Sequence, residues 1–111
     1  MVQSKIQALI AKEVEAIKNI PIDGIIQNAI ELIHEQVHVK RGKLVVSGMG
    51  KAGQIGVNIA TTLASTGTPA IFLHPSESQH GDLGMVQEND ILLLSSLSAQ
   101  LLINKEKLFD F

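Results

Sequence analysis

The sequence predicts an α/β fold built on a parallel sheet of about three strands. Short apolar runs alternate along the chain with segments whose apolar residues recur at helical spacing. The expected strands are Lys43–Ser47, Ala70–Leu73 and Asp90–Ser95. Helices are expected from about Ala52 to Ser65 and from Ser76 to near Gly84. Because strands alternate with helices, the sheet should be parallel, with right-handed crossovers and helices on both faces.

Two amphipathic helices are expected before the first strand. The first carries an apolar stripe formed by Ile6, Leu9, Ile10, Val14 and Ile17. Pro21 should end this helix and open the next, which Gly42 follows. The second helix carries a wider stripe formed by Ile22, Ile25, Ile26, Ala29, Ile30, Leu32, Ile33 and Val37. This stripe and the apolar segment Leu101–Ile103 together exceed what a three-stranded sheet can bury within one subunit, so the sequence predicts self-association.

The composition restricts the classes of partner. With 111 residues, 45% of them hydrophobic, the chain can form one domain with a core. A net charge of −2 argues against nucleic acid or a membrane surface as the main partner, because both call for a concentrated basic face. The cluster of Lys40, Arg41 and Lys43 is expected in a solvated turn. The absence of cysteine excludes disulfides, and without a signal peptide or spanning segment a cytoplasmic protein is expected.

A glycine-rich turn is expected between the first strand and the helix that follows it. Gly48, Gly50 and Gly53 allow a sharp turn with exposed N–H groups, and the positive end of the helix and Lys51 favour an anion there. The same spacing fits a dinucleotide fingerprint, but that fingerprint needs an acidic residue after the next strand. No acidic residue occurs between Glu35 and Glu77, so no dinucleotide cofactor is expected. A tight turn that binds nothing is the alternative.

The segment His34–His38 spells H-E-x-x-H on an expected helix, the spacing that places two imidazoles on one face for zinc. A catalytic zinc needs a third ligand, and the extended form of the motif fails at Arg41 and Leu44. Val37 lies on the apolar stripe, which turns Glu35 and His38 to the flank of the helix. The motif is therefore interpreted as a coincidental polar face, and no metal is expected.

Polar residues follow each expected strand at the edge where parallel sheets bind ligands. Ser47 and Gly48 follow the first strand and His74 the second, while His80 and Asp82 lie on a glycine-flanked loop beyond it. A serine-rich segment, Ser95-Ser96-Leu97-Ser98, follows the third strand and would face the glycine turn if the first and third strands are neighbours. Simple strand capping and loop connection remain open for each of these residues.

Taken together, four motifs resemble the arabinose-5-phosphate isomerases of the sugar isomerase (SIS) domain family. They are Gly42–Gly53, Ala64–Pro69, His74–Glu77 and His80–Met85. The resemblance implies a flavodoxin-like three-layer sheet in the order 2-1-3, preceded by two helices and assembled into a dimer or tetramer. It also implies interconversion of arabinose 5-phosphate and ribulose 5-phosphate through an enediol, on the route to the lipopolysaccharide or capsule sugar Kdo, without an organic cofactor.

The resemblance also assigns roles to individual residues. The residues matching catalytic positions are Lys51 and His80. The residues matching the serine-rich phosphate loop are Ser96 and Ser98, and the expected pocket lining is Ser47, Gly48 and His74. The phosphorylated sugar is thus the expected ligand.

The chain departs from the family pattern after the third expected strand. Members generally read Ser-Asn-Ser-Gly there, often followed by Glu, whereas this chain has Leu97, Ala99 and Gln100 at the matching points. The second half of the family sheet is absent, so the chain is interpreted as one truncated SIS domain with helices at 1–41, a core at 42–98 and a divergent tail at 99–111. An impaired isomerase is expected. The alternatives are a non-catalytic module that binds a phosphosugar or Kdo nucleotide as a sensor or subunit, and a scaffold without a ligand.

Overall fold

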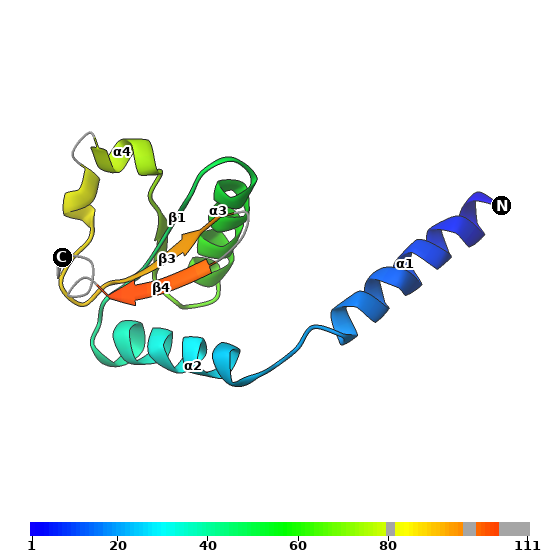
Figure 1. The fold of residues 1–111 in the computed structure, drawn as a ribbon, viewed down its shortest axis with the longest axis horizontal. Helices are drawn as coiled ribbons and strands as arrows, with labels where there is room; N and C mark the ends of the chain where they lie inside the picture. Colours follow the sequence, from blue (N-terminus) through cyan, green and yellow to red (C-terminus); the bar gives the residue numbers. More distant parts are fainter. Residues whose placement is uncertain (80–81, 97–99, 105–111) are drawn as a thin grey trace.

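A computed structural model describes residues 1–79, 82–96 and 100–104, and within these ranges the sheet has four strands. The strands are β1 (Leu44–Gly48), β2 (Ala70–Phe72), β3 (Ile91–Ser95) and β4 (Gln100–Asn104), in the order β2-β1-β3-β4. β1 pairs in parallel with β2 and with β3, which confirms the predicted three parallel strands in the order 2-1-3. β4 was not expected and pairs antiparallel with β3 (Figure 1).

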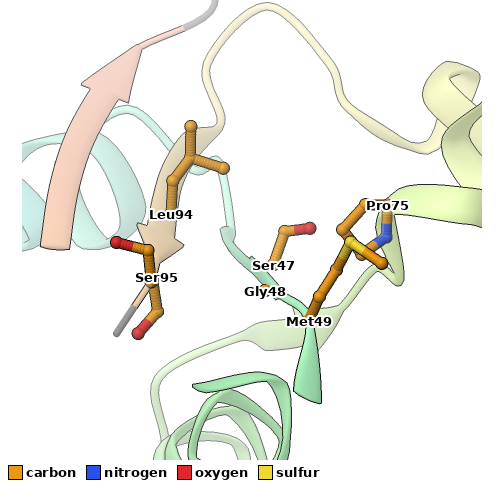
Figure 2. Close-up of a pocket in the computed structure, with 7 residues that line it drawn as sticks. Ser47, Gly48, Met49, Pro75, Leu94 and Ser95 are labelled. Carbon is orange, nitrogen blue, oxygen red and sulfur yellow. The ribbon is translucent and has the colours of Figure 1, made fainter. Parts of the chain in front are cut away.

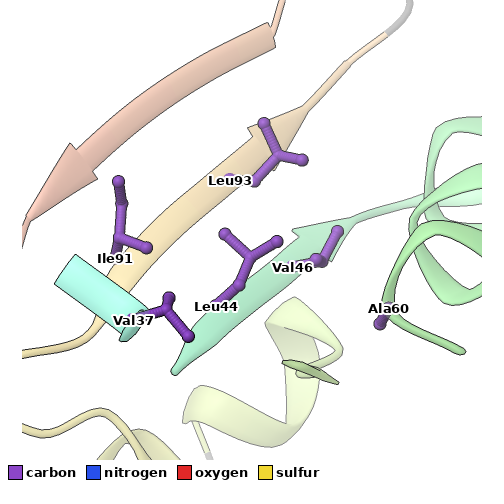
Figure 3. Packing of buried hydrophobic residues seen from close by; sticks show 6 residues of the cluster. All are labelled: Val37, Leu44, Val46, Ala60, Ile91 and Leu93. Carbon is purple, nitrogen blue, oxygen red and sulfur yellow. The ribbon is translucent and has the colours of Figure 1, made fainter. Parts of the chain in front are cut away.

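Alternating residues of the strands divide the core into two clusters, one on each face of the sheet. One cluster is formed by Val37, Leu44, Val46, Ala60, Ile91 and Leu93 (Figure 3). The other is formed by Val45, Leu73, Val86 and Leu92. All five residues of β1 are buried, as a central parallel strand requires. Strand β1 is therefore the centre around which the other elements are arranged.

Helix α3 (Gly50–Ser65) packs on the sheet through small residues. Its buried positions are Ala52, Gly53, Gly56 and Ala60. A Cβ on Gly53 would lie 2.6 Å from the Gly48 carbonyl oxygen, and one on Gly56 would lie 2.9 Å from Val46 Cγ1. Because these distances leave no room for a methyl group, the glycines bring the helix backbone against the end of β1.

The second N-terminal helix, α2 (Gly24–Ile33), begins later than Pro21 because Asp23 caps it. The Asp23 carboxylate accepts hydrogen bonds from the backbone N–H groups of Ile25 and Ile26. The helix then widens into a π-helical turn, η1 (His34–Val39), which the sequence did not indicate. This turn places two consecutive side chains, Gln36 and Val37, in the core.

Polar contacts hold the amino ends of β1 and β3 together. Asp90 is buried and its Oδ2 lies 2.6 Å from Lys43 Nζ. Lys43 was expected in a solvated turn, but the structure pairs it with Asp90. Asp90 also accepts the backbone N–H groups of Lys43 and Gln87. Gln36 Nε2 donates to the Asn89 carbonyl at 3.1 Å, which ties the π-helical turn to the same loop. These contacts fix the edge of the sheet opposite to the predicted ligand site.

The segment between β2 and β3 forms two short helices where one was expected. These are α4 (Pro75–Gln79) and the 3-10 helix η2 (Asp82–Met85). Val86 follows η2 directly, is buried and belongs to the second core cluster. This segment therefore covers the face of the sheet opposite α3 and η1.

Helix α1 (Val2–Lys18) extends away from the domain and has no buried residue (Figure 1). Its stripe of Ile6, Leu9, Ile10, Val14 and Ile17 is 44–65% exposed, and α2 also has no buried residue. Within the described residues, no helix is long and apolar enough to cross a membrane. Ile33 at the end of α2 packs against the core cluster, whereas the stripe of α1 and the outer residues Ile25 and Ile30 of α2 stay exposed within the described residues.

Replacing Gly53 by Ala is expected to lower the free energy of unfolding by about 1–3 kcal/mol, because the added methyl group would press on the Gly48 backbone. Denaturant unfolding at a fixed protein concentration measures the change. Gly24→Ala is the matched control, since a Cβ there meets no atom within 4 Å. Equal stability of the Gly53→Ala variant and the wild type would contradict the close approach.

The wild-type chain is expected to self-associate through α1 and α2, because both helices carry large apolar side chains that are exposed in the described part of the chain. Ile25 is 78% exposed, so Ile25→Glu should shift sedimentation velocity at micromolar concentration toward a smaller species. Asn28→Asp adds the same charge at an exposed polar position of α2 and should leave the distribution unchanged. A stable wild-type monomer would refute the expectation.

Candidate phosphosugar site

A hollow of about 570 Å³ opens at the carboxyl edge of the parallel strands. It is lined by Ser47, Gly48, Met49, Pro75, Leu94, Ser95 and Ser96. In Figure 2, Ser47 and Met49 lie across the hollow from Leu94 and Ser95. Parallel pairing of β1 with β3 places Ser47 beside Leu94 and Gly48 beside Ser95, which brings the two strand ends to one site.

The turn between β1 and α3 has the geometry of an anion-binding helix start. Met49 is the N-cap, with φ −118° and ψ 155°, and its side chain makes no capping hydrogen bond. Gly50 has φ +62°, a left-handed conformation that glycine adopts without strain. The first N–H groups of a helix have no partner within the helix, and here no cap residue supplies one. The turn can therefore donate backbone hydrogen bonds to an anion.

Lys51 is the cation of this turn. It lies in the first turn of α3, is exposed, and does not line the hollow itself. A lysine side chain is long and flexible, so its ammonium group can approach an anion bound at the turn without a fixed position beforehand. Ser47, by contrast, is buried at 8% exposure and offers its hydroxyl from a fixed strand position.

A second, smaller hollow of about 230 Å³ lies against the α3 side of the same turn. It is lined by Gly48, Gly50, Gly53, Gln54, Val57, Phe72 and His74. Gly48 borders both hollows, whereas Ser47 lines only the larger one and His74 only the smaller one. Alternation along the strands places Ser47 on the same face as Val45, and His74 on the opposite face with Phe72.

The structure brings together part of the residue set that the sequence indicated. Ser47, Gly48 and Ser96 line the larger hollow, and His74 lines the smaller hollow next to it. His80 and Ser98 lie outside the described residues, so their proposed roles stay predictions.

Three lining residues of the larger hollow were not predicted from the sequence. They are Met49, Pro75 and Leu94. Each is the chain neighbour of a predicted site segment: the glycine turn, His74 and the serine-rich segment, respectively. Their position next to these segments was the one feature of the sequence that could have identified them.

The H-E-x-x-H segment lies away from these hollows, on the π-helical turn η1. The rings of His34 and His38 have centroids 5.6 Å apart, and His38 Nε2 lies 3.1 Å from Thr68 Oγ1. In the described part of the chain, no group of three or more His, Cys, Asp or Glu side chains is arranged to hold a metal ion. The two histidines thus share one side of the turn without a third ligand of these types.

Two relatives named as arabinose 5-phosphate isomerases match parts of this chain. Arabinose 5-phosphate isomerase GutQ of Escherichia coli K12 is 63% identical over 57 residues, which are 51% of this chain and 18% of GutQ. Arabinose 5-phosphate isomerase KdsD of Shigella flexneri is 47% identical over 92 residues, which are 80% of this chain and 28% of KdsD. The chain thus matches about a fifth to a quarter of the length of these relatives.

Solved structures share the fold. A candidate phosphosugar isomerase of Bacteroides fragilis, described as involved in capsule formation, is 62% identical with a TM-score of 0.74, and the match covers 85% of this chain and 49% of that one. A protein of Escherichia coli CFT073 in complex with arabinose 5-phosphate is 34% identical with a TM-score of 0.61, over 84% of this chain and 48% of that one. The SIS domain family matches residues 38–101, which is more than half of the sequence and includes both hollows. This chain therefore belongs to the SIS domain family and is close to phosphosugar isomerases.

Proposed function

We propose that this chain binds a pentose phosphate of the arabinose 5-phosphate and ribulose 5-phosphate type. The observation that carries the proposal is the hollow in which Ser47, Gly48 and Ser96 meet beside the start of α3. Its location, at the carboxyl ends of neighbouring parallel strands, is the usual ligand site of such sheets. The relatives named as arabinose 5-phosphate isomerases, and the fold neighbour in complex with arabinose 5-phosphate, support this choice of sugar.

The phosphate group is proposed to bind at the glycine turn. Backbone N–H groups at the start of α3 and the hydroxyl of Ser47 would donate hydrogen bonds, and the helix end favours negative charge. Ser96 lines the same hollow from the end of β3 and would contact the phosphate from the other side. Lys51 would add a charge-assisted hydrogen bond, which is stronger than a neutral one.

Isomerisation would require more than phosphate binding. The opened aldose must lose its C2 proton to a base, and the resulting enediolate needs a nearby positive charge. Lys51 can supply that charge. The proposed base is His80 or a group from another subunit, since the amide of Gln100 cannot accept the proton as a carboxylate would. We therefore propose a site that binds the sugar phosphate weakly and turns it over slowly or not at all in the chain as given.

The proposed setting is an assembly of several copies in the formation of the lipopolysaccharide or capsule sugar Kdo. The capsule role described for the Bacteroides fragilis neighbour agrees with this setting. The chain matches about half of each solved neighbour, so groups from another chain could complete the chemistry. A non-catalytic module that senses a phosphosugar or Kdo nucleotide is the alternative, and Leu97, Ala99 and Gln100 are the residues that favour it.

Arabinose 5-phosphate is expected to bind the wild-type chain, and Lys51→Ala should weaken this binding roughly 10-fold or more, because a hydrogen bond to a charged group is lost. Isothermal titration calorimetry gives the two dissociation constants. Lys40→Ala removes an exposed lysine at the C-cap of η1 and should leave binding unchanged. Unchanged affinity in Lys51→Ala would refute the role of Lys51, and no binding by the wild type would refute the proposed function.

Turnover of arabinose 5-phosphate by the same sample is expected to be slow or undetectable. Loss of one positioned general base commonly costs about 10²–10⁴ in rate, and Gln100 provides none. A coupled assay for ribulose 5-phosphate measures the rate. Gln100→Glu places a carboxylate of similar length at this position, where relatives of the family often have Glu, and should raise the rate. An ordinary enzymatic rate in the wild type would contradict the impairment and leave the binding proposal standing.

A further inference from the structure

His74 is held in one orientation by the residue two positions after it. The backbone N–H of Ser76 donates to His74 Nδ1 at 3.2 Å, and Ser76 Oγ lies 2.8 Å from the same nitrogen. His74 is thereby the N-terminal cap of α4, whose first residue is Pro75. The residue before a proline favours extended backbone, which suits both the end of β2 and a cap position.

The contact with the Ser76 backbone determines which ring nitrogen carries the proton. A backbone N–H can only donate, so Nδ1 must offer its lone pair, and in the neutral imidazole the hydrogen then sits on Nε2. The Ser76 hydroxyl can rotate and also donates to Nδ1 in this arrangement. This tautomer follows from the hydrogen-bond network. His74 therefore presents a fixed Nε2–H donor.

The position of His74 directs it toward the smaller hollow. Alternation along the strand places Phe72 and His74 on the α3 face of the sheet, and their rings meet edge to face with centroids 6.4 Å apart. His74 lines the hollow together with Gln54 and the backbone of the glycine turn. Within the described part of the chain, Nε2 has no hydrogen-bond partner.

Among the described residues, no carboxylate, lysine or arginine lines the smaller hollow. Gln54 and His74 contribute polar groups, Phe72 and Val57 contribute apolar surface, and three glycines complete the described lining. The N–H donors of an amide and an imidazole suit hydroxyl and carbonyl oxygens, whereas Lys51 and the start of α3 nearby suit a phosphate. The two hollows share Gly48, so a ligand bound at the turn by its phosphate has the smaller hollow beside it.

We propose that His74 determines recognition of the sugar, with its Nε2–H donating to a hydroxyl or carbonyl oxygen of the carbon chain while the glycine turn and Lys51 hold the phosphate. This inference rests on the proposed function. It assigns His74 a contact with the ligand in addition to the capping of α4. The two roles use different ring nitrogens, and for this reason they can be separated by substitution.

Two variants separate the roles. His74→Asn keeps a side-chain oxygen that can cap α4 but removes the donor at the Nε2 position. His74→Gln keeps an N–H donor with longer reach but caps poorly. We expect His74→Asn to weaken binding of arabinose 5-phosphate roughly 2- to 12-fold, the range for one lost neutral hydrogen bond, with little change in thermal stability. His74→Gln should bind more tightly than His74→Asn.

Calorimetry with arabinose 5-phosphate and with inorganic phosphate gives the decisive comparison. His74→Asn should weaken only the sugar phosphate, whereas Lys51→Ala should weaken both ligands. Equal weakening of both ligands in His74→Asn, or tighter binding by His74→Asn than by His74→Gln, would overturn the assignment and leave the proposed function intact. Failure of the wild type to bind arabinose 5-phosphate would instead refute the proposed function, and the role of His74 with it.

The tautomer has a spectroscopic test that needs no ligand. A long-range ¹H–¹⁵N correlation spectrum in alkaline buffer should show His74 with a protonated Nε2, and the signal is identified by its loss in His74→Asn. Addition of arabinose 5-phosphate should shift the Nε2 resonance. A protonated Nδ1 in the free protein, or an Nε2 resonance that does not respond to bound sugar phosphate, would overturn the proposal.

Discussion

The structure depends on one backbone-to-backbone contact, between the end of β1 and the first turn of α3. A Cβ on Gly53 would meet the Gly48 carbonyl at 2.6 Å, and a Cβ on Gly48 would meet the Ser95 carbonyl at 2.8 Å. Three segments therefore converge at Gly48 without an intervening side chain. Since the helix start lies against the strand ends, its N–H groups and the hydroxyls of Ser47 and Ser96 reach the same space.

The opposite end of the sheet maintains this convergence. Asp90 bridges the starts of β1 and β3 through Lys43 and through backbone N–H groups, so the two strands cannot slide against each other. A shift of one residue would move Ser47 away from the larger hollow, because successive side chains face opposite sides of the sheet. Gly42 is part of the same arrangement, since its Cα lies against the Asn89 backbone. The polar contacts at the amino edge thus position the site at the carboxyl edge.

Local sequence patterns predicted those parts of the fold that depend on the spacing of apolar residues and of glycines. The apolar runs of β1 and β3 and the glycine turn follow from side-chain burial and backbone freedom, so the parallel strands and the site edge were predictable in outline, whereas the strand order came from the family resemblance. No local pattern indicated the π-helical turn, and the hydrogen bond that accompanies it joins Gln36 to Asn89, residues far apart in sequence. The left-handed residue at the end of this turn is Arg41, with φ +64°, rather than Gly42. The pairing of Lys43 with Asp90 was missed for the same reason.

The candidate site, too, was predicted only in part. Ser47, Gly48, His74 and Ser96 could be named from their positions after strands, but no local pattern showed that they serve two hollows. That division comes from strand alternation around Gly48. The exposed apolar side chains of α1 and α2 lie elsewhere on the molecule. Figure 1 shows α2 running into η1, whose Gln36 bonds to the Asn89 carbonyl in the loop before β3, at the amino edge of the sheet. The proposed assembly surface and the proposed ligand site therefore lie at different ends of the sheet. Substitutions on α1 and α2 are expected to change self-association without touching the glycine turn, and substitutions at the turn are expected to change ligand affinity without touching the helices.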